Sequence, residues 1–159
     1  MRSLPFTLAS MLPAPYHDVV VDHHRHPRNF GALPGCTHAA DGANPLCGDR
    51  LRVELRLHGG LIAALRFSGD ACAIATASAS IMSELVIGAD AAGVAHLRSR
   101  LDAVLSGACE HDAVLGPANA LAGLRDYASR RPCALLPWAA VQAALSGAAA
   151  ATTEDAAPR

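Results

Sequence analysis

Three cysteines and one aspartate carry the side chains of this sequence that are best suited to chemistry. Cys47 and Asp49 stand two positions apart, whereas Cys72 and Cys133 lie far along the chain. Thiolates and carboxylates are ligands of zinc and iron, and three sulfurs with one oxygen suit a tetrahedral zinc site. An aspartate ligand is expected to exchange more readily than a third thiolate, which would let such a site take part in a reaction. No Cys-x-x-Cys pair marks the site, so the spacing alone leaves metal binding and unrelated cysteines equally open.

The predicted strands begin directly after Asp49. Residues 50–57 alternate polar and apolar with a period of two, which predicts a half-buried strand. The Gly59-Gly60 pair is a hairpin turn signal, and the apolar residues 61–67 predict the antiparallel partner strand. The turn-rich stretch 27–48 has room for one more short strand, around Cys36 to Ala40.

Helical patterns fill most of the remaining chain. Helices are predicted at residues 16–26, 72–87, 91–105, 117–127 and 133–145. Pro137 fits a regular helix only in its first turn, which predicts that the regular part of the last helix begins near Leu136. A helix, a small antiparallel sheet of about three strands and a C-terminal set of helices together define an α+β fold.

The chemistry-bearing residues lie in recognisable local sequences. Four motifs follow one another along the chain: Asp22-His23-His24 with Pro27-Arg28-Asn29; Asn44-Pro45-Leu46-Cys47-Gly48-Asp49; Ser68-Gly69-Asp70-Ala71-Cys72; and Cys133-Ala134-Leu135-Leu136-Pro137-Trp138. In this order they resemble the iron–sulfur assembly proteins of the IscU/NifU/SufU family. The resemblance covers roughly residues 16–145.

The interval between the second and third cysteine distinguishes branches of that family. From Cys72 to Cys133 the gap is wide, with room for an extra helical segment within residues 90–119. This is similar to the SufU branch, which carries such an insertion, whereas IscU scaffolds have a shorter gap and a His before the last cysteine. Pro132 stands at that position here, where SufU-type proteins often have Lys, so the role of the position is open. Arg130 matches an Arg of the SufU type and is a candidate for stabilising a thiolate.

What the resemblance implies is a zinc-dependent sulfur carrier. Cys47, Asp49, Cys72 and Cys133 would bind zinc. Cys47 would accept sulfane sulfur from a SufS-type cysteine desulfurase, and downstream iron–sulfur assembly proteins would receive it. A partner His is implied to replace Cys47 on the metal, which would free the thiolate for attack.

Two alternatives to the carrier stay open. One is a scaffold on which a [2Fe–2S] cluster is assembled, which the wide gap and the missing His count against. The other is a non-enzymatic, zinc-stabilised interaction module. Whether the protein acts as an enzyme is therefore open as well.

Length and composition set the remaining expectations. With 159 residues the chain makes about one domain, predicted at 16–146, with disordered tails at 1–15 and 147–159. A net charge of −1 gives no electrostatic footprint for nucleic acid or an anionic membrane, and no apolar run reaches the roughly 20 residues of a membrane span. Five scattered cysteines are unlike a disulfide framework, which favours a reducing cytoplasm.

The other candidate ligands are predicted to lie outside a metal site. Cys36 and Cys109 match no ligand position of the family and are interpreted as structural or incidental. His23 and His24 are adjacent and face different ways, so the early histidine cluster is not expected to bind metal. Arg125 is expected to be a solvated helix residue.

Overall fold

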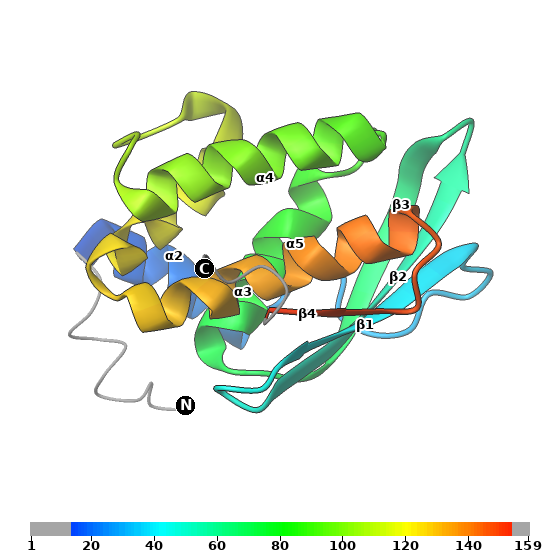
Figure 1. The fold of residues 1–159 in the computed structure, drawn as a ribbon, viewed down its shortest axis with the longest axis horizontal. Coiled ribbons are helices and arrows are strands. Elements are labelled where there is room, and N and C mark those ends of the chain that lie inside the picture. Colours follow the sequence, from blue (N-terminus) through cyan, green and yellow to red (C-terminus); the bar gives the residue numbers. More distant parts are fainter. Residues whose placement is uncertain (1–13, 154–159) are drawn as a thin grey trace.

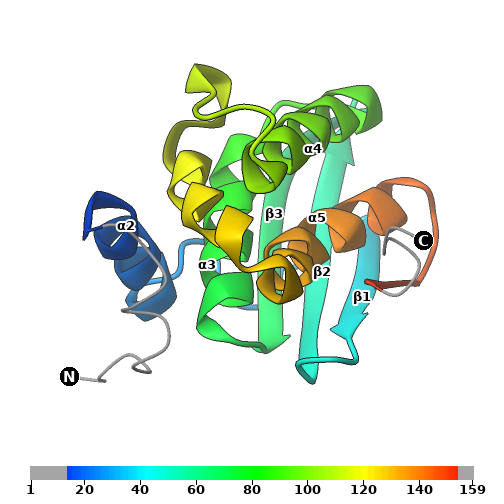
Figure 2. The same ribbon diagram turned by 60° about the vertical axis from the view of Figure 1, so that its left-hand side comes forward.

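The computed structural model describes residues 14–153, which form one sheet and the helices packed on it (Figures 1 and 2). The elements follow in the order α2 (Ala14–Arg25), β1 (His38–Asn44), β2 (Asp49–His58), β3 (Leu61–Asp70), α3 (Ala73–Leu85), α4 (Ala91–Ser106), η1 (Ala113–Asp126), η2 (Ala128–Arg130), α5 (Arg131–Leu145) and β4 (Ala150–Thr152). Helices α3 and α5 pack against the sheet, and α2, α4 and η1 pack mainly against other helices. This arrangement confirms the predicted α+β fold.

The sheet has four strands in the order β3-β2-β1-β4. Strands β1, β2 and β3 are antiparallel neighbours. The β2–β3 hairpin is as predicted, and the short strand expected around Cys36 to Ala40 is present as β1 at His38–Asn44. Gly59 and Gly60 have φ values of 60° and 79°, the left-handed pair that a two-residue hairpin turn requires. Along β2, Leu51, Val53 and Leu55 are buried while the residues between them are more exposed, so the period-two prediction for this strand is confirmed.

Strand β4 departs from the predicted loose tail. Ala150–Thr152 pairs in parallel with residues 41–43 of β1, and the Thr153 N–H donates to the carbonyl oxygen of Ala43 at 3.2 Å. Because β1 would otherwise be an edge strand, its free backbone groups give even a short alanine-rich segment a pairing partner. The tail prediction therefore does not hold for residues 150–153. The predicted tail residues 1–13 and 154–159 lie outside the described residues.

Helix α5 also begins earlier than expected. It starts at Arg131, with Pro132 in its first turn, where a missing N–H costs nothing. Pro137 is therefore inside the helix, not at its start, and has no N–H to donate to the carbonyl of Cys133 four residues earlier. Strand β1 lies very close to this helix. The closeness is seen at Gly42, where a Cβ would be 3.1 Å from Cδ1 of Leu136. The start of α5 is thereby held against β1.

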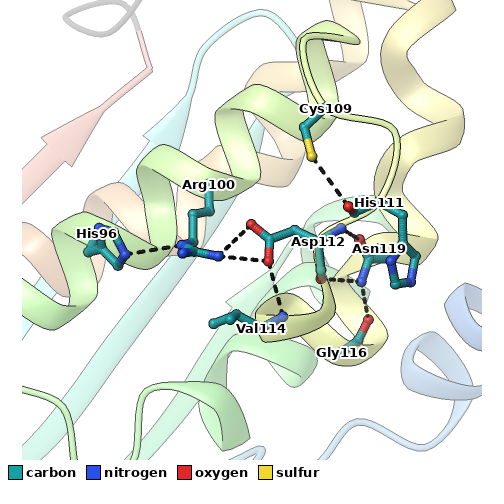
Figure 3. Close-up of polar contacts among 8 residues, drawn as sticks. All are labelled: His96, Arg100, Cys109, His111, Asp112, Val114, Gly116 and Asn119. Carbon is teal, nitrogen blue, oxygen red and sulfur yellow. Dashed lines mark hydrogen bonds and ion pairs between the residues drawn. The ribbon is translucent and has the colours of Figure 1, made fainter.

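The helical insertion between α3 and α5 is present as α4 and η1, although η1 is a 3-10 helix interrupted at Gly116 (φ 48°, ψ −124°). A polar network fixes its loop (Figure 3). Both carboxylate oxygens of Asp112 accept hydrogen bonds from Nη1 of Arg100 at 2.8 Å. The Asn119 side chain donates to the Asp112 carbonyl at 2.7 Å and accepts the Asp112 N–H at 2.8 Å.

Arg125 takes part in holding this insertion. Its Nη2 donates to the carbonyl oxygens of Val104, Cys109 and Glu110 at 3.2, 3.4 and 3.1 Å. The expectation of a solvated helix residue is therefore wrong: Arg125 satisfies one carbonyl group in the last turn of α4, where unpaired carbonyls gather, and two in the loop that follows. Among residues 14–153, no helix is long and apolar enough to cross a membrane.

Candidate metal centre

Three of the four predicted ligands meet where β1, β2 and α5 converge. Cys47 lies in the loop after β1, Asp49 is the first residue of β2, and Cys133 is in the first turn of α5. Their ligand atoms, two sulfurs and one carboxylate oxygen, all lie within 4.8 Å of one another. The Cys133 thiol is hydrogen bonded to Sγ of Cys47 at 3.3 Å. Residues 86 positions apart thus form one cluster.

Cys72 borders this cluster without joining the 4.8 Å group. It is the N-cap of α3, and its Sγ accepts the Ala75 N–H at 3.5 Å. Its own backbone N–H donates to Oδ1 of Asp49 at 2.8 Å. The capping role explains the orientation of Cys72, because Sγ turns toward the free N–H groups of its helix.

Gly69 sets the position of Cys72. Its φ is +134°, and a Cβ there would lie 2.3 Å from the carbonyl oxygen of Arg50 and 2.7 Å from Cα of Leu51. Only a glycine therefore lets the end of β3 approach the start of β2 so closely. This approach brings the N–H of Cys72 within reach of Asp49.

The side chain of Asp49 is incompletely satisfied. The residue is 3% exposed, and while Oδ1 accepts the Cys72 N–H, Oδ2 is buried without a hydrogen-bond partner. A buried carboxylate oxygen without a partner is costly, and a cation is the natural group to satisfy it. Two thiols beside this carboxylate supply the soft ligands that zinc accepts. The residues present therefore fit a zinc ion.

The pKa values of the Cys72 and Cys133 thiols are shifted in opposite directions. A hydrogen bond from Cys133 lowers the pKa of Cys72, against the opposing effect of burial. The same hydrogen bond, together with burial, raises the pKa of Cys133 well above that of an ordinary thiol. In the metal-free protein, Cys133 therefore holds its proton. A bound divalent cation favours the thiolate form of every sulfur near it.

A residue that sequence reasoning missed touches the cluster. Asn44 is 1% exposed, and its Nδ2 donates to Sγ of Cys133 at 3.4 Å. Its side-chain oxygen accepts a hydrogen bond from the Thr153 hydroxyl at 3.0 Å. The sequence offered one hint, because Asn44 opens the motif that contains Cys47. Thr153 carried no signal at all.

The remaining candidates lie apart from the cluster. Within residues 14–153, Arg130 makes no hydrogen bond or ion pair with the cysteines or Asp49, so its thiolate-stabilising role stays a prediction. Cys36 Sγ is hydrogen bonded to Glu54 at 3.6 Å, and Cys109 Sγ donates to the His111 carbonyl at 3.3 Å.

His23 belongs to the interface between α2 and α3. The residue is 6% exposed, and its Nδ1 lies 2.7 Å from the Ser80 hydroxyl. Burial lowers the pKa of His23, which favours the neutral imidazole at this interface.

Comparison with known proteins defines the class of this chain. Residues 15–134 match the family model of the NifU-like N terminal domain, so the chain belongs to this family of iron–sulfur cluster assembly proteins. It is 34% identical over 128 residues to the zinc-dependent sulfurtransferase SufU of Bacillus subtilis, covering 80% of this chain and 86% of that protein.

A second relative carries a different named function at nearly the same identity. The iron–sulfur cluster assembly scaffold protein IscU of Streptococcus pyogenes is 33% identical over 137 residues, covering 84% of each chain. Among solved structures, the N-terminal part of a nitrogen-fixing NifU-like protein from Brucella abortus superposes with a TM-score of 0.77 at 23% identity, covering 88% of this chain and 96% of that one. These relatives confirm the family and the fold, and they leave the branch within the family open.

Proposed function

We propose that this protein is a zinc-dependent sulfur carrier that accepts sulfane sulfur on Cys47 from a cysteine desulfurase and supplies it for iron–sulfur cluster assembly. One observation carries the proposal: an exposed cysteine lies in a loop beside a buried thiol and an unsatisfied carboxylate. The relative from Bacillus subtilis, a zinc-dependent sulfurtransferase, supports the same function.

The proposed zinc ligands are Cys47, Asp49, Cys72 and Cys133. Cys47, Asp49 and Cys133 already lie within 4.8 Å of one another, and in this proposal Cys72 joins them by turning its Sγ away from the Ala75 N–H. Zinc, when bound, keeps its thiols deprotonated at neutral pH. Asp49 contributes the one oxygen ligand through Oδ2 while Oδ1 keeps the N–H of Cys72.

The transfer itself is a thiol exchange on sulfur. The Cys47 thiolate attacks the outer sulfur of the desulfurase persulfide, a new sulfur–sulfur bond forms on Cys47, and the desulfurase cysteine leaves as a thiolate. No net oxidation occurs, and the outer sulfur passes intact. Cys47 suits this step because it is exposed and followed by Gly48 (φ 69°), whereas Cys72 and Cys133 are fixed at helix starts.

The decisive experiment combines metal analysis with mass spectrometry. Protein purified without added metal is expected to hold about one zinc per chain. After incubation with a cysteine desulfurase and cysteine, the Cys47 peptide is expected to gain about 32 Da, one sulfur atom. Cys47→Ala should stay folded and lose both the added mass and the stimulation of the desulfurase, and Cys36→Ala is the matched control. Added mass on Cys133 or Cys36, with Cys47→Ala still active, would contradict the assignment.

A scaffold for a [2Fe–2S] cluster is the second candidate, favoured by the similarity to the IscU protein of Streptococcus pyogenes. Coloured protein that contains iron and sulfide in place of zinc would select it. If Cys47→Ala instead unfolds the protein, the ion serves the fold, as in a zinc-stabilised interaction module.

A further inference from the structure

Asn44 connects two of the site cysteines through different groups. Its side-chain Nδ2 donates to Sγ of Cys133 at 3.4 Å, within the usual range for an N–H donor on sulfur. Its backbone carbonyl accepts the Cys47 N–H at 3.3 Å, which closes the turn that presents Cys47. One residue therefore fixes the buried thiol of the cluster and the base of the loop that carries the exposed one.

Thr153 decides which way the Asn44 amide points. The hydroxyl of Thr153 donates to Oδ1 of Asn44 at 3.0 Å, and Thr153 is itself 7% exposed. An amide held by a donor on its oxygen must present its N–H₂ group to the opposite side, where Cys133 lies. Without that hydroxyl, the amide could rotate and place its oxygen against a thiolate. Thr153, which directly follows β4 and lies 109 positions from Asn44, is thus linked to the candidate metal centre through a single side-chain hydrogen bond.

We infer that Asn44 is a positioning residue that quenches the reactivity of Cys133 and that Thr153 orients it for this task. The inference rests on the proposed sulfur carrier and deepens it, since it explains how one thiolate of the centre is chosen for attack. An N–H donor draws charge from a thiolate and makes it less nucleophilic. Cys133 has this N–H donor, whereas among residues 14–153 no N–H group donates to Sγ of Cys47, whose hydrogen bond comes from the Cys133 thiol and is lost when that thiol ionises.

The test measures alkylation of each cysteine in the folded, zinc-loaded protein by mass spectrometry, with iodoacetamide as the probe. Thr153→Val removes the hydroxyl at constant shape, and Thr153→Ser is the matched control that keeps it. Asn44→Leu removes the N–H donor at similar volume. Thr153→Val and Asn44→Leu are each expected to raise the alkylation rate of Cys133 at least about five-fold, whereas Thr153→Ser stays close to the unaltered protein.

The double variant separates orientation from packing. If Thr153 acts through Asn44, adding Thr153→Val to Asn44→Leu leaves the Cys133 rate where Asn44→Leu alone puts it. The double variant also removes both partners of the buried hydrogen bond and leaves no orphaned hydroxyl, which favours its folding. If Asn44→Leu does not fold, the Val and Ser variants at position 153 decide the question.

Several outcomes would overturn the inference. These are an unchanged Cys133 rate in the Thr153→Val and Asn44→Leu variants, equal increases for Val and Ser at position 153, and additive effects in the double variant. The labelling uses neither desulfurase nor persulfide. A failure of sulfur transfer to Cys47 would therefore count against the proposed function, and an unchanged Cys133 rate against the role of Asn44.

Discussion

Asp49 and Asp112 are two largely buried aspartates with opposite surroundings. Asp112, in the insertion, has both carboxylate oxygens on Arg100, and its Oδ1 also accepts the Val114 N–H at 3.0 Å (Figure 3). Asp49, in the metal centre, has one oxygen on the Cys72 N–H and one with no partner, and two thiols lie beside it.

The difference separates a group that serves the fold from one that awaits a ligand. A carboxylate paired with an arginine and a backbone N–H has all its oxygens hydrogen bonded, and these bonds offset its desolvation. A buried carboxylate with an unpaired oxygen gains its missing partner only when a ligand such as a cation binds. The comparison can be tested by changing each aspartate with and without zinc.

Removal of zinc is expected to have the largest effect. A ligand present at about a thousand times its dissociation constant stabilises the folded state by about 4 kcal/mol, so a chelator should lower the melting temperature by roughly 10 °C or more. Calorimetry of the same sample before and after chelation measures this. Asp112→Asn should show a similar drop on chelation, because its site holds no metal. A melting temperature indifferent to chelation would remove the distinction between the two aspartates.

Changing Asp112 to Asn should cost stability with or without zinc. The substitution takes the charge from the hydrogen bonds with Arg100 and replaces one acceptor oxygen by a donor, at an expected cost of about 1–2 kcal/mol because Arg100 is partly exposed. Urea unfolding of zinc-loaded and metal-free protein measures the two values. Zinc content should stay at that of the unaltered protein, and a loss of zinc would show that the insertion and the metal centre are coupled.

The same substitution at Asp49 should behave in the opposite way. Asp49→Asn keeps the acceptor for the Cys72 N–H and removes a buried, half-satisfied charge. Metal-free protein should therefore be as stable as before or slightly more stable. Zinc should remain bound, since three thiolates and a water can complete a tetrahedron, with affinity reduced by about ten-fold or more. Competition with a chromophoric chelator measures the affinity, and a destabilised metal-free Asp49→Asn would show that this carboxylate also serves the fold.

Leu46 offers the smallest and most specific change. It is 83% exposed and precedes Cys47, so any partner that reaches the Cys47 sulfur must cover it. Leu46→Ser should leave zinc content and melting temperature unchanged and raise the concentration needed for half-maximal desulfurase stimulation by about ten-fold, as expected for one large apolar side chain. Leu61→Ser, at the far end of β3 and also exposed, is the control. Equal responses from the two variants would place the partner elsewhere.

Local patterns were enough to predict the hairpin and the existence of most helices, whereas the set Cys47, Asp49, Cys72 and Cys133 came from the family resemblance and not from spacing. The alternation along β2 and the glycine pair at 59–60 are local signals, because a few neighbouring residues determine the strand and its turn. Strand β4 could not be predicted, because its three residues gain their structure from the free edge of β1 and not from their own pattern.

Long-range side-chain contacts were equally invisible in the sequence. The hydrogen bond between Asn44 and Thr153 joins residues that share no motif, and the partnership depends on how β4 meets β1. The sequence pattern places the start of α5 too late, because Pro137 is typical of a first helical turn although Pro132 already fills that role. The capping role of Cys72 explains why its thiol, although predicted as a ligand, turns toward its own helix.

The separation in sequence between Cys47 and Cys133 has a consequence for synthesis of the protein. The ribosome makes the chain from its N-terminus, so Cys47, Asp49 and Cys72 emerge well before Cys133 and before Thr153, the hydrogen-bond partner of Asn44. Such contacts between distant residues form late in folding. The nascent chain therefore passes through a stage with exposed thiols and an incomplete set of ligands. In the proposed site, the four ligands come together only once α5 has docked against the sheet.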